Sequence, residues 1–217
     1  MIRIYELFRS LFFCLRFLPF KQAVKIPIYL SNNVRNVSIK GRIVLDYGDL
    51  KRYQIAIGHS GSQGLQAFHS SILIQKGGRL VFKGPAVIGQ GTVIRVDANA
   101  TMEIGKKFYC NKNCYFRCHK SIVIGERVTL GWNNTLNDAD GHSVYYGDKS
   151  SNSVIGTITV GNHVWITTNC FINKDVIIPD ECVVALGSVV NKFVVQPHSL
   201  IGGVPAKVIR ENINWKE

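Results

Sequence analysis

Residues 160–190 read VGNHVWITTNCFINKDVIIPDECVVALGSVV, and a large aliphatic residue returns in them at every sixth position. The repeated positions are Val160, Ile166, Ile172, Ile178, Val184 and Val190. A six-residue step does not match the 3.6-residue period of an α-helix, and β-branched residues favour strands. Each hexad is therefore predicted to form one short strand and a corner.

The same step recurs in shorter runs earlier in the chain, at residues 88–94, 104–116 and 124–136. One aliphatic side chain per hexad has to point inward, and stacked coils then bury a core that no single repeat could bury. The glycine after the aliphatic residue, as at Gly161, is expected to ease the corner. The sequence predicts an all-β solenoid over residues 31–200, preceded by a segment at 1–30 and followed by a cap at 201–217.

Two segments break the six-residue period. Residues 137–157 are too polar for a core and are predicted to loop out of the coil, where binding and catalytic side chains commonly lie. Beyond Val190 the repeats end at Gly202, Gly203 and Pro205. Residues 206–212 are predicted to form a short helix that closes this end of the coil, because a solenoid needs a cap.

The N-terminal segment is apolar but not continuously so. Residues 2–18 are rich in Phe and Leu, and Arg3, Glu6, Arg9 and Arg16 interrupt them. About 20 uninterrupted apolar residues are needed to cross a bilayer, and no small-residue cleavage site of a signal peptide follows. We therefore expect a helix that either packs on the coil or lies on a membrane surface.

The net charge of the chain limits its expected binding partners, and its cysteine content indicates the expected cellular compartment. The 217-residue chain has a formal net charge of +12 at pH 7, which favours phosphorylated cofactors, nucleic acid, acidic glycans or membrane surfaces. Nucleic acid is not expected, because no aromatic stacking platform or reading helix is visible. The six cysteines match no secreted disulfide framework, so we expect reduced thiols and a cytoplasmic protein, with the inner face of the membrane as a second location.

Two segments resemble a known family. Residues 160–166 (VGNHVWI) and 203–210 (GVPAKVIR) are similar to the closing signature of the hexapeptide-repeat acyltransferases. With the earlier hexads, the resemblance covers about two thirds of the chain. It implies a left-handed parallel β-helix with three strands per coil, a homotrimer and no metal. The sequence departs from the family pattern at Thr167 and Pro179, where glycine is usual, and the coil is expected to survive both.

The sequence DADGH at residues 138–142, combined with the same C-terminal end, is similar to the sugar O-acetyltransferases of this family. This resemblance implies acetyl-CoA as co-substrate and a saccharide acceptor, as in capsule, O-antigen or exopolysaccharide biosynthesis. Repeats by themselves report the fold and not the function. The expected function therefore depends on the loop and not on the hexads.

His142 is the expected general base. A hydroxyl attacks a thioester slowly at neutral pH, so a base must remove its proton, and imidazole can do this near the working pH. Asp138 and Asp140 lie close enough in sequence to orient the ring, as in other base–orienter pairs. The alternative for His142 is a solvated loop histidine, and the alternative for each aspartate is a turn-forming role.

The resemblance also implies binding residues for both substrates. Asn111 and His119 match positions where sugar acetyltransferases of this family contact the acceptor. The groove for coenzyme A is implied at Trp165, Thr168, Leu186, Gly187, Ser188, Asn191, Lys192, Lys207 and Arg210. The basic members of this set could pair with phosphate, although a basic residue near a terminus is more often simply solvated.

Cysteines and histidines also raise the question of a metal. The cluster Cys110, Cys114, Cys118 and His119 has four-residue spacings that scatter side chains around a coil, whereas a zinc site needs them to converge. The small-residue position of a hexad is the expected place for Cys114, Cys170 and Cys182, as core residues.

Other functions remain open as alternatives. One is a non-catalytic scaffold that binds an anionic partner, and another is a serine acetyltransferase-like enzyme with an amino-acid acceptor. A carbonic anhydrase version of the fold needs three converging histidines; His119, His142 and His163 are available, but their spacings are unlike that pattern.

Overall fold

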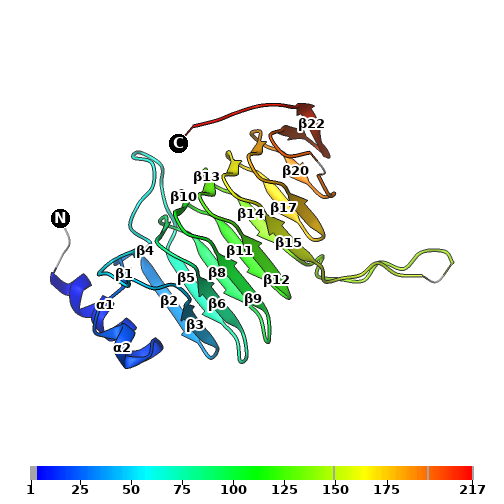
Figure 1. Cartoon of the computed structure of the whole chain (residues 1–217). Helices are drawn as coiled ribbons and strands as arrows, with labels where there is room; N and C mark the ends of the chain where they lie inside the picture. Colours follow the sequence, from blue (N-terminus) through cyan, green and yellow to red (C-terminus); the bar gives the residue numbers. More distant parts are fainter. Residues whose placement is uncertain (1–3, 149, 195, 217) are drawn as a thin grey trace.

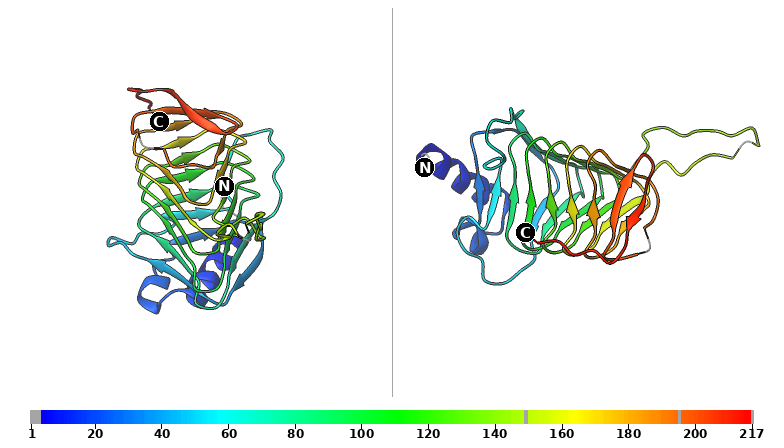
Figure 2. Two further views of the ribbon diagram at one scale, coloured as in Figure 1. Left: turned by 90° about the vertical axis from the view of Figure 1, so that its right-hand side faces the viewer. Right: turned by 90° about the horizontal axis from the view of Figure 1, so that it is seen from above.

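The six-residue repeat forms three sheets of short strands that wind into one long coil with three faces (Figures 1 and 2). This architecture is seen in a computed structural model that describes residues 4–148, 150–194 and 196–216. From β1 to β18, each turn of the coil contributes one strand to each sheet, and neighbouring turns are joined by parallel pairing. The predicted all-β parallel coil is confirmed.

The three sheets are called A, B and C in the order in which the chain visits them. Sheet A contains β1 (Ile28–Leu30), β4 (Ile55–Ile57), β7 (Ala86–Ile88), β10 (Phe108–Cys110), β13 (Thr129–Leu130), β16 (Trp165–Ile166), β19 (Val183–Val184), β21 (Leu200–Gly203) and β22 (Ala206–Arg210). Sheet B contains β2 (Val34–Ile39), β5 (Ser70–Ile74), β8 (Val93–Val96), β11 (Tyr115–Cys118), β14 (Thr135–Asn137), β17 (Phe171–Asn173) and β20 (Val189–Val190). Sheet C contains β3 (Arg42–Leu45), β6 (Arg79–Phe82), β9 (Thr101–Ile104), β12 (Ser121–Ile124), β15 (Thr157–Val160) and β18 (Val176–Ile178).

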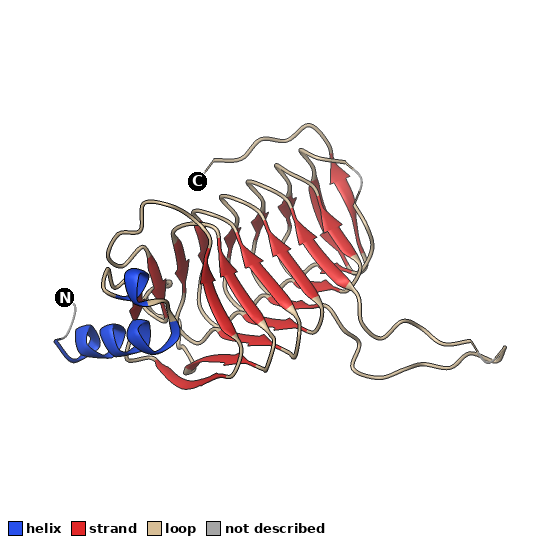
Figure 3. Ribbon diagram, turned by 60° about the horizontal axis from the view of Figure 1, so that its bottom comes forward, coloured by secondary structure: helices blue, strands red, loops and turns tan. Residues whose placement is uncertain are grey.

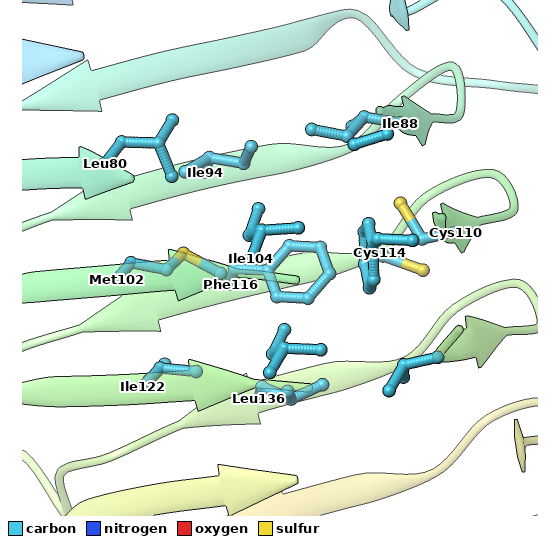
Figure 4. Packing of buried hydrophobic residues seen from close by; sticks show 14 of the residues in the cluster. Leu80, Ile88, Ile94, Met102, Ile104, Cys110, Cys114, Phe116, Ile122 and Leu136 are labelled. Carbon is cyan, nitrogen blue, oxygen red and sulfur yellow. The ribbon is translucent and has the colours of Figure 1, made fainter. Parts of the chain in front are cut away.

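Strand register explains the six-residue step. Ile166 pairs with Val184, and Ile172 pairs with Val190, so one full turn of this part of the coil contains three hexads. The aliphatic residue of every predicted hexad points inward and is at most 2% exposed. These side chains stack in rows along the interior (Figure 4). Phe108 and Phe116 meet edge to face in this core. Each hexad thus contributes one large side chain to a single continuous core.

The corners need two different kinds of residue. A left-handed backbone recurs every six residues, for example at Asn169 and Asp175, with φ near +60°. Asn and Asp tolerate this conformation better than other residues that have a Cβ. The glycine that follows the aliphatic residue has another role: at Gly125 an added Cβ would collide with the backbone of Gly161 in the next turn. That glycine permits close stacking of turns and does not supply the left-handed backbone. The coil continues through Thr167 and Pro179, as predicted.

All six cysteines are free and buried. Cys114, Cys170 and Cys182 are at most 1% exposed, which confirms the core position predicted for them. The described residues contain no group of three or more His, Cys, Asp or Glu side chains that could hold a metal ion.

Two helices lie at the N-terminal end of the coil, α1 (Ile4–Phe17) and α2 (Phe20–Ala23) (Figure 3). One face of α1 buries Phe13 and Cys14 against the core. The Ser10 hydroxyl accepts a hydrogen bond from the Leu30 N–H on β1, the first strand of sheet A. In this way α1 covers the end of the coil and satisfies part of its edge. No helix among the described residues is long and apolar enough to cross a membrane.

The C-terminal end differs from the prediction. A helix was expected at residues 206–212, but Ala206–Arg210 form strand β22, which pairs antiparallel with β21. The reason is the open edge of sheet A: β21 offers unpaired backbone groups there, and a strand satisfies them where a helix would not.

Two loops project from the coil. One leaves the coil between Asn137, the last residue of β14, and Thr157, the first residue of β15, and extends far from the body as two antiparallel arms (Figure 1). A second excursion, at residues 58–69 between β4 and β5, was not predicted. Its sequence, GHSGSQGLQAFH, is rich in Gly and Ser, so a signal for a loop was present.

Candidate functional site

The long loop is fixed at its base by Asp138. The Asp138 carboxylate is fully buried and accepts hydrogen bonds from the N–H groups of His119 at 2.6 Å, Lys120 at 2.9 Å and Ser121 at 2.9 Å. Its carbonyl accepts a hydrogen bond from the Gly156 N–H at the other end of the loop. Asp138 was expected to orient His142, but its oxygens are committed to the backbone of the preceding turn. Its role here is to anchor the loop.

The two arms of the loop are held together by Asp140 and Asn152. The Asn152 amide donates to the Asp140 carboxylate at 2.8 Å, and the Lys174 ammonium lies 3.4 Å from the same oxygen. The Asp140 N–H also donates to the Val154 carbonyl. His142 lies two residues further along the exposed arm and has no hydrogen-bond partner among the described residues. The loop therefore presents a free imidazole on an arm whose base is fixed.

His119 is paired with a carboxylate that sequence reasoning did not single out. The His119 Nδ1 atom lies 2.9 Å from the Asp97 carboxylate, which also accepts hydrogen bonds from Arg95 and Gln75. Both side chains are less than one fifth exposed. This chain of contacts runs along the edge between sheets B and C, the same edge from which the long loop leaves the coil. This pair is hard to detect in the sequence, because Asp97 and His119 are one turn apart in the coil and 22 residues apart in sequence.

Asn111 lies on a different edge, between sheets A and B. Its amide donates to the Ser62 hydroxyl at 2.8 Å, and its oxygen accepts from the Ser62 N–H at 2.9 Å. Lys112 donates to the Leu65 carbonyl, and Asn113 donates to the Gln66 carbonyl. In this structure Asn111 therefore holds the unpredicted loop 58–69, and strand β11 separates Asn111 from His119.

Most of the residues implied for coenzyme A gather on sheet A and its edge with sheet B. Trp165 and Arg210 belong to one row of sheet A, which continues through Val183 and Leu200. Thr168, Leu186, Gly187 and Ser188 lie at corners that lead from sheet A to sheet B. Leu186, Lys207 and Arg210 are exposed, whereas the Ser188 hydroxyl is buried and bonds to Ala185 and Gly203. Asn191 and Lys192 follow β20 and lie apart from this set, on the B–C edge.

The C-terminal tail adds an aromatic residue that sequence reasoning missed. The Trp215 ring stacks on His163 with centroids 4.2 Å apart, and its Nε1–H donates to the His163 carbonyl at 2.9 Å. Trp215 also contacts Trp165, with 5.9 Å between ring centroids. An isolated Trp near a chain end gives little local sign of its contacts, so only the fold reveals this pairing.

The candidate residues thus lie on two edges of one three-sided coil. The A–B edge and sheet A present apolar surface and the cations Lys207 and Arg210, which could hold a molecule that combines phosphates with an apolar arm. The B–C edge presents the long loop with His142, together with His119. Sheet B lies between the two edges.

Comparison with known proteins shows which sequences the chain resembles. No protein-family model matches it. A Klebsiella pneumoniae protein described as an uncharacterized 24.8 kDa protein in the cps region is 31% identical over 211 residues, 97% of this chain and 87% of that protein. The galactoside O-acetyltransferase of Escherichia coli K12 is 35% identical over 113 residues, 52% of this chain and 55% of that enzyme, so the chain spans little more than half of that relative.

A solved structure agrees on the fold. A hexapeptide transferase family protein from Anaplasma phagocytophilum has a TM-score of 0.51 and 19% identity, and the match covers 83% of this chain and 86% of that one. The chain is a parallel β-helix of hexapeptide repeats. It belongs to the hexapeptide-repeat acetyltransferase family.

Proposed function

We propose that this protein is an acetyl-CoA-dependent O-acetyltransferase that acts on a sugar hydroxyl, in capsule, O-antigen or exopolysaccharide biosynthesis. The observation that carries the proposal is the projecting loop, which presents the free imidazole of His142 on an anchored base. The similarity to a galactoside O-acetyltransferase supports a sugar acceptor.

In the proposed reaction, His142 takes the proton from the acceptor hydroxyl as its oxygen bonds to the thioester carbonyl carbon. The carbon–sulfur bond then breaks, and the coenzyme A sulfur leaves and receives the proton from the imidazolium. Transfer is direct, without an acyl-enzyme. The burial of all six cysteines supports this, because a buried thiol cannot reach the thioester, and burial also raises the pKa of the Cys118 thiol to about 12.

Acetyl-CoA is proposed to bind along sheet A and the A–B edge. Lys207 and Arg210 would pair with its phosphates, and Trp165 and Leu186 would contact its apolar arm. Gly187 could offer backbone without obstruction, since nothing lies within 4 Å of where its Cβ would be. Thr168 and Ser188 lie at the same edge, with Ser188 limited to a structural part because its hydroxyl is already bonded. Asn191 and Lys192 lie on the B–C edge and are not part of this proposed site.

The proposed active form is a homotrimer. His142 and the proposed cofactor cations lie on opposite sides of sheet B, and a rigid coil cannot bring two of its own edges together. A neighbouring copy could place its A–B edge beside the loop of the first chain. Each site would then take residues from two chains, as closed rings of identical subunits allow. On the acceptor side, His119 shares the loop's edge, so we propose it as the acceptor contact ahead of Asn111.

The function is tested by incubating the full chain with acetyl-CoA and a panel of acceptors, and by measuring thiol release. The panel holds free sugars, nucleotide sugars, oligosaccharides and L-serine, and mass spectrometry then locates the acetyl group. We expect a sugar hydroxyl to be modified and serine to be inert. Transfer to serine would favour the amino-acid alternative, and no transfer to any acceptor would favour the anionic-partner scaffold.

The shared site is tested by mixing two inactive variants. His142→Ala and Lys207→Glu/Arg210→Glu are co-expressed in equal amounts and assayed at limiting acetyl-CoA. If each site combines two chains, random trimers should regain about a quarter of wild-type activity, because that fraction of sites receives two unaltered halves. Activity no higher than that of either variant alone would contradict the shared site.

A further inference from the structure

The outer face of α1 is apolar, which is unusual for a helix that covers the end of a coil. Ile4, Phe8, Phe12 and Leu15 follow one another at helical spacing and are 73%, 69%, 66% and 47% exposed. The opposite face, with Phe13 and Cys14, is the one packed on the core. A helix on a protein surface normally turns polar residues outward. Apolar side chains gathered on an outer face indicate an interaction surface.

Basic charge is concentrated in the same region. The first 53 residues contain ten Lys and Arg against three Asp and Glu, a net +7 of the chain's +12. The three acidic side chains have partners: Glu6 is buried and accepts from Tyr29 and Asn32, Asp46 pairs with Lys83, and Asp49 pairs with Lys51. These acidic groups are already subtracted in the net charge of +7, so a clear positive excess remains at this end of the coil.

Open hollows join the apolar and the basic features. One, of about 290 Å³, lies between α1 and β2, with Phe12 and Phe17 on its walls and Arg9, Arg16 and Arg35 around it. A larger one, of about 760 Å³, lies between the helices and β3 and includes Arg16 and Arg42. Guanidinium groups beside aromatic side chains match a ligand with an anionic head and hydrocarbon chains.

We propose that the outer face of α1 and these arginine-lined hollows form a docking surface for membranes that contain anionic phospholipid. With 14 residues, α1 is about 21 Å long, too short to cross a bilayer, so it would lie in the plane of the interface. Phe8 and Phe12 would enter the boundary between headgroups and acyl chains, and the arginines would contact lipid phosphates. The positive charge of this end favours a membrane over a second copy of the chain, because two such faces would repel each other.

The test is co-sedimentation of the full chain with vesicles of phosphatidylcholine, with and without 30% phosphatidylglycerol. We expect binding to the anionic vesicles that weakens in 0.5 M salt. Phe8→Ser/Phe12→Ser should lower the partition coefficient at least about tenfold, because two aromatic side chains lose their apolar contact. Arg16→Gln/Arg35→Gln should lower it roughly fivefold for each charge.

Matched controls come from the rest of the coil. Phe193→Ser/Ile209→Ser removes two similarly exposed apolar side chains at the C-terminal end, and Lys107→Gln/Lys120→Gln removes two exposed charges on central turns. Neither control should change binding, and all variants should keep the wild-type melting temperature, since the altered side chains are exposed.

Three outcomes would overturn the proposal: no preference of the wild type for anionic vesicles, equal losses in the controls, or a fall in oligomeric state of Phe8→Ser/Phe12→Ser in sedimentation equilibrium. The last result would assign the face to a contact between copies of the chain. Vesicle binding is measured without acetyl-CoA, so its failure leaves the proposed transferase activity to be judged by its own assay.

Discussion

The coil and the loop at residues 137–157 are neighbours in sequence, but the coil buries its large side chains and the loop exposes them. The turns of the coil repeat one backbone pattern and commit their large side chains to a shared core. The loop buries little of itself and instead leaves His142, Tyr145 and Tyr146 exposed. Asp138 joins the two regions, because it is buried like the coil but holds the loop. The comparison teaches that stability should depend on the coil and catalysis on the loop.

The largest effect is expected in the loop, on rate and not on stability. His142→Ala should lower kcat by roughly 10² to 10⁴, the range for loss of a positioned general base, while the affinity for acetyl-CoA changes little. The melting temperature should stay constant because the side chain is exposed. Initial rates with the true acceptor and thermal denaturation measure the two quantities.

His69→Ala is the control, since His69 is exposed on the other loop. Asp140→Asn should cost less than His142→Ala, because Asp140 supports the arm and does not take the proton. Activity of His142→Ala within about threefold of wild type would refute the base role.

The next effect is expected in the coil, on stability. Ile172 is fully buried, and Ile172→Ala should lower the free energy of unfolding by about 2 to 5 kcal/mol through lost burial and the cavity left behind. Ile177→Ala is the matched control, because Ile177 is 42% exposed on the next strand. Urea denaturation measures both. Equal losses at the two positions would show that burial does not decide stability here.

Sequence reasoning captured the coil because one period governs it. The aliphatic positions, the buried cysteines and the long loop follow from spacing and polarity alone. The C-terminal strand could not be foreseen, since Ala206–Arg210 extend because of an edge that β21 creates. The loop at 58–69 lies where the hexads are fragmentary, so no period marked its interruption.

The site was harder to predict than the fold for a physical reason. A motif indicates candidate residues by their position in the sequence, but their partners are set by contacts at least one turn of the coil away. Asp138 bonds to a corner 17 to 19 residues earlier, and Asn111 bonds to Ser62, 49 residues earlier. Short-range sequence cannot show such pairs. The proposed site between two chains is even harder to predict, because it depends on contacts that no single chain contains.

Asp138 should give an intermediate effect on both regions. Asp138→Ala would leave three partly buried N–H groups without their acceptor, which should lower the free energy of unfolding by about 2 to 3 kcal/mol. Cleavage within residues 139–156 by a low dose of protease should become faster, because the loop loses its anchor. Asp138→Asn keeps one acceptor oxygen and should lose less. If Asp138→Ala kept wild-type stability and wild-type cleavage rates, Asp138 would not be the anchor of the loop.

The smallest expected effect is the response of the coil to alkaline pH, and its sign follows from the buried thiols. Burial raises the pKa of Cys14 from 9.0 to about 11, and burial together with the charge of Asp138 raises that of Cys118 to about 12. Below pH 9 both thiols are protonated in the folded and the unfolded chain, so their contribution to stability is complete. Above pH 9 the unfolded chain ionises first, and stability falls by up to about 1.4 kcal/mol per thiol and pH unit until the folded pKa is reached.

Urea denaturation at pH 8, 9 and 10 should show this fall, and Cys14→Ala should make it shallower than in wild type. An identical pH dependence in Cys14→Ala would mean that other groups cause the loss, whereas His142→Ala should leave the dependence unchanged because the loop carries none of these thiols.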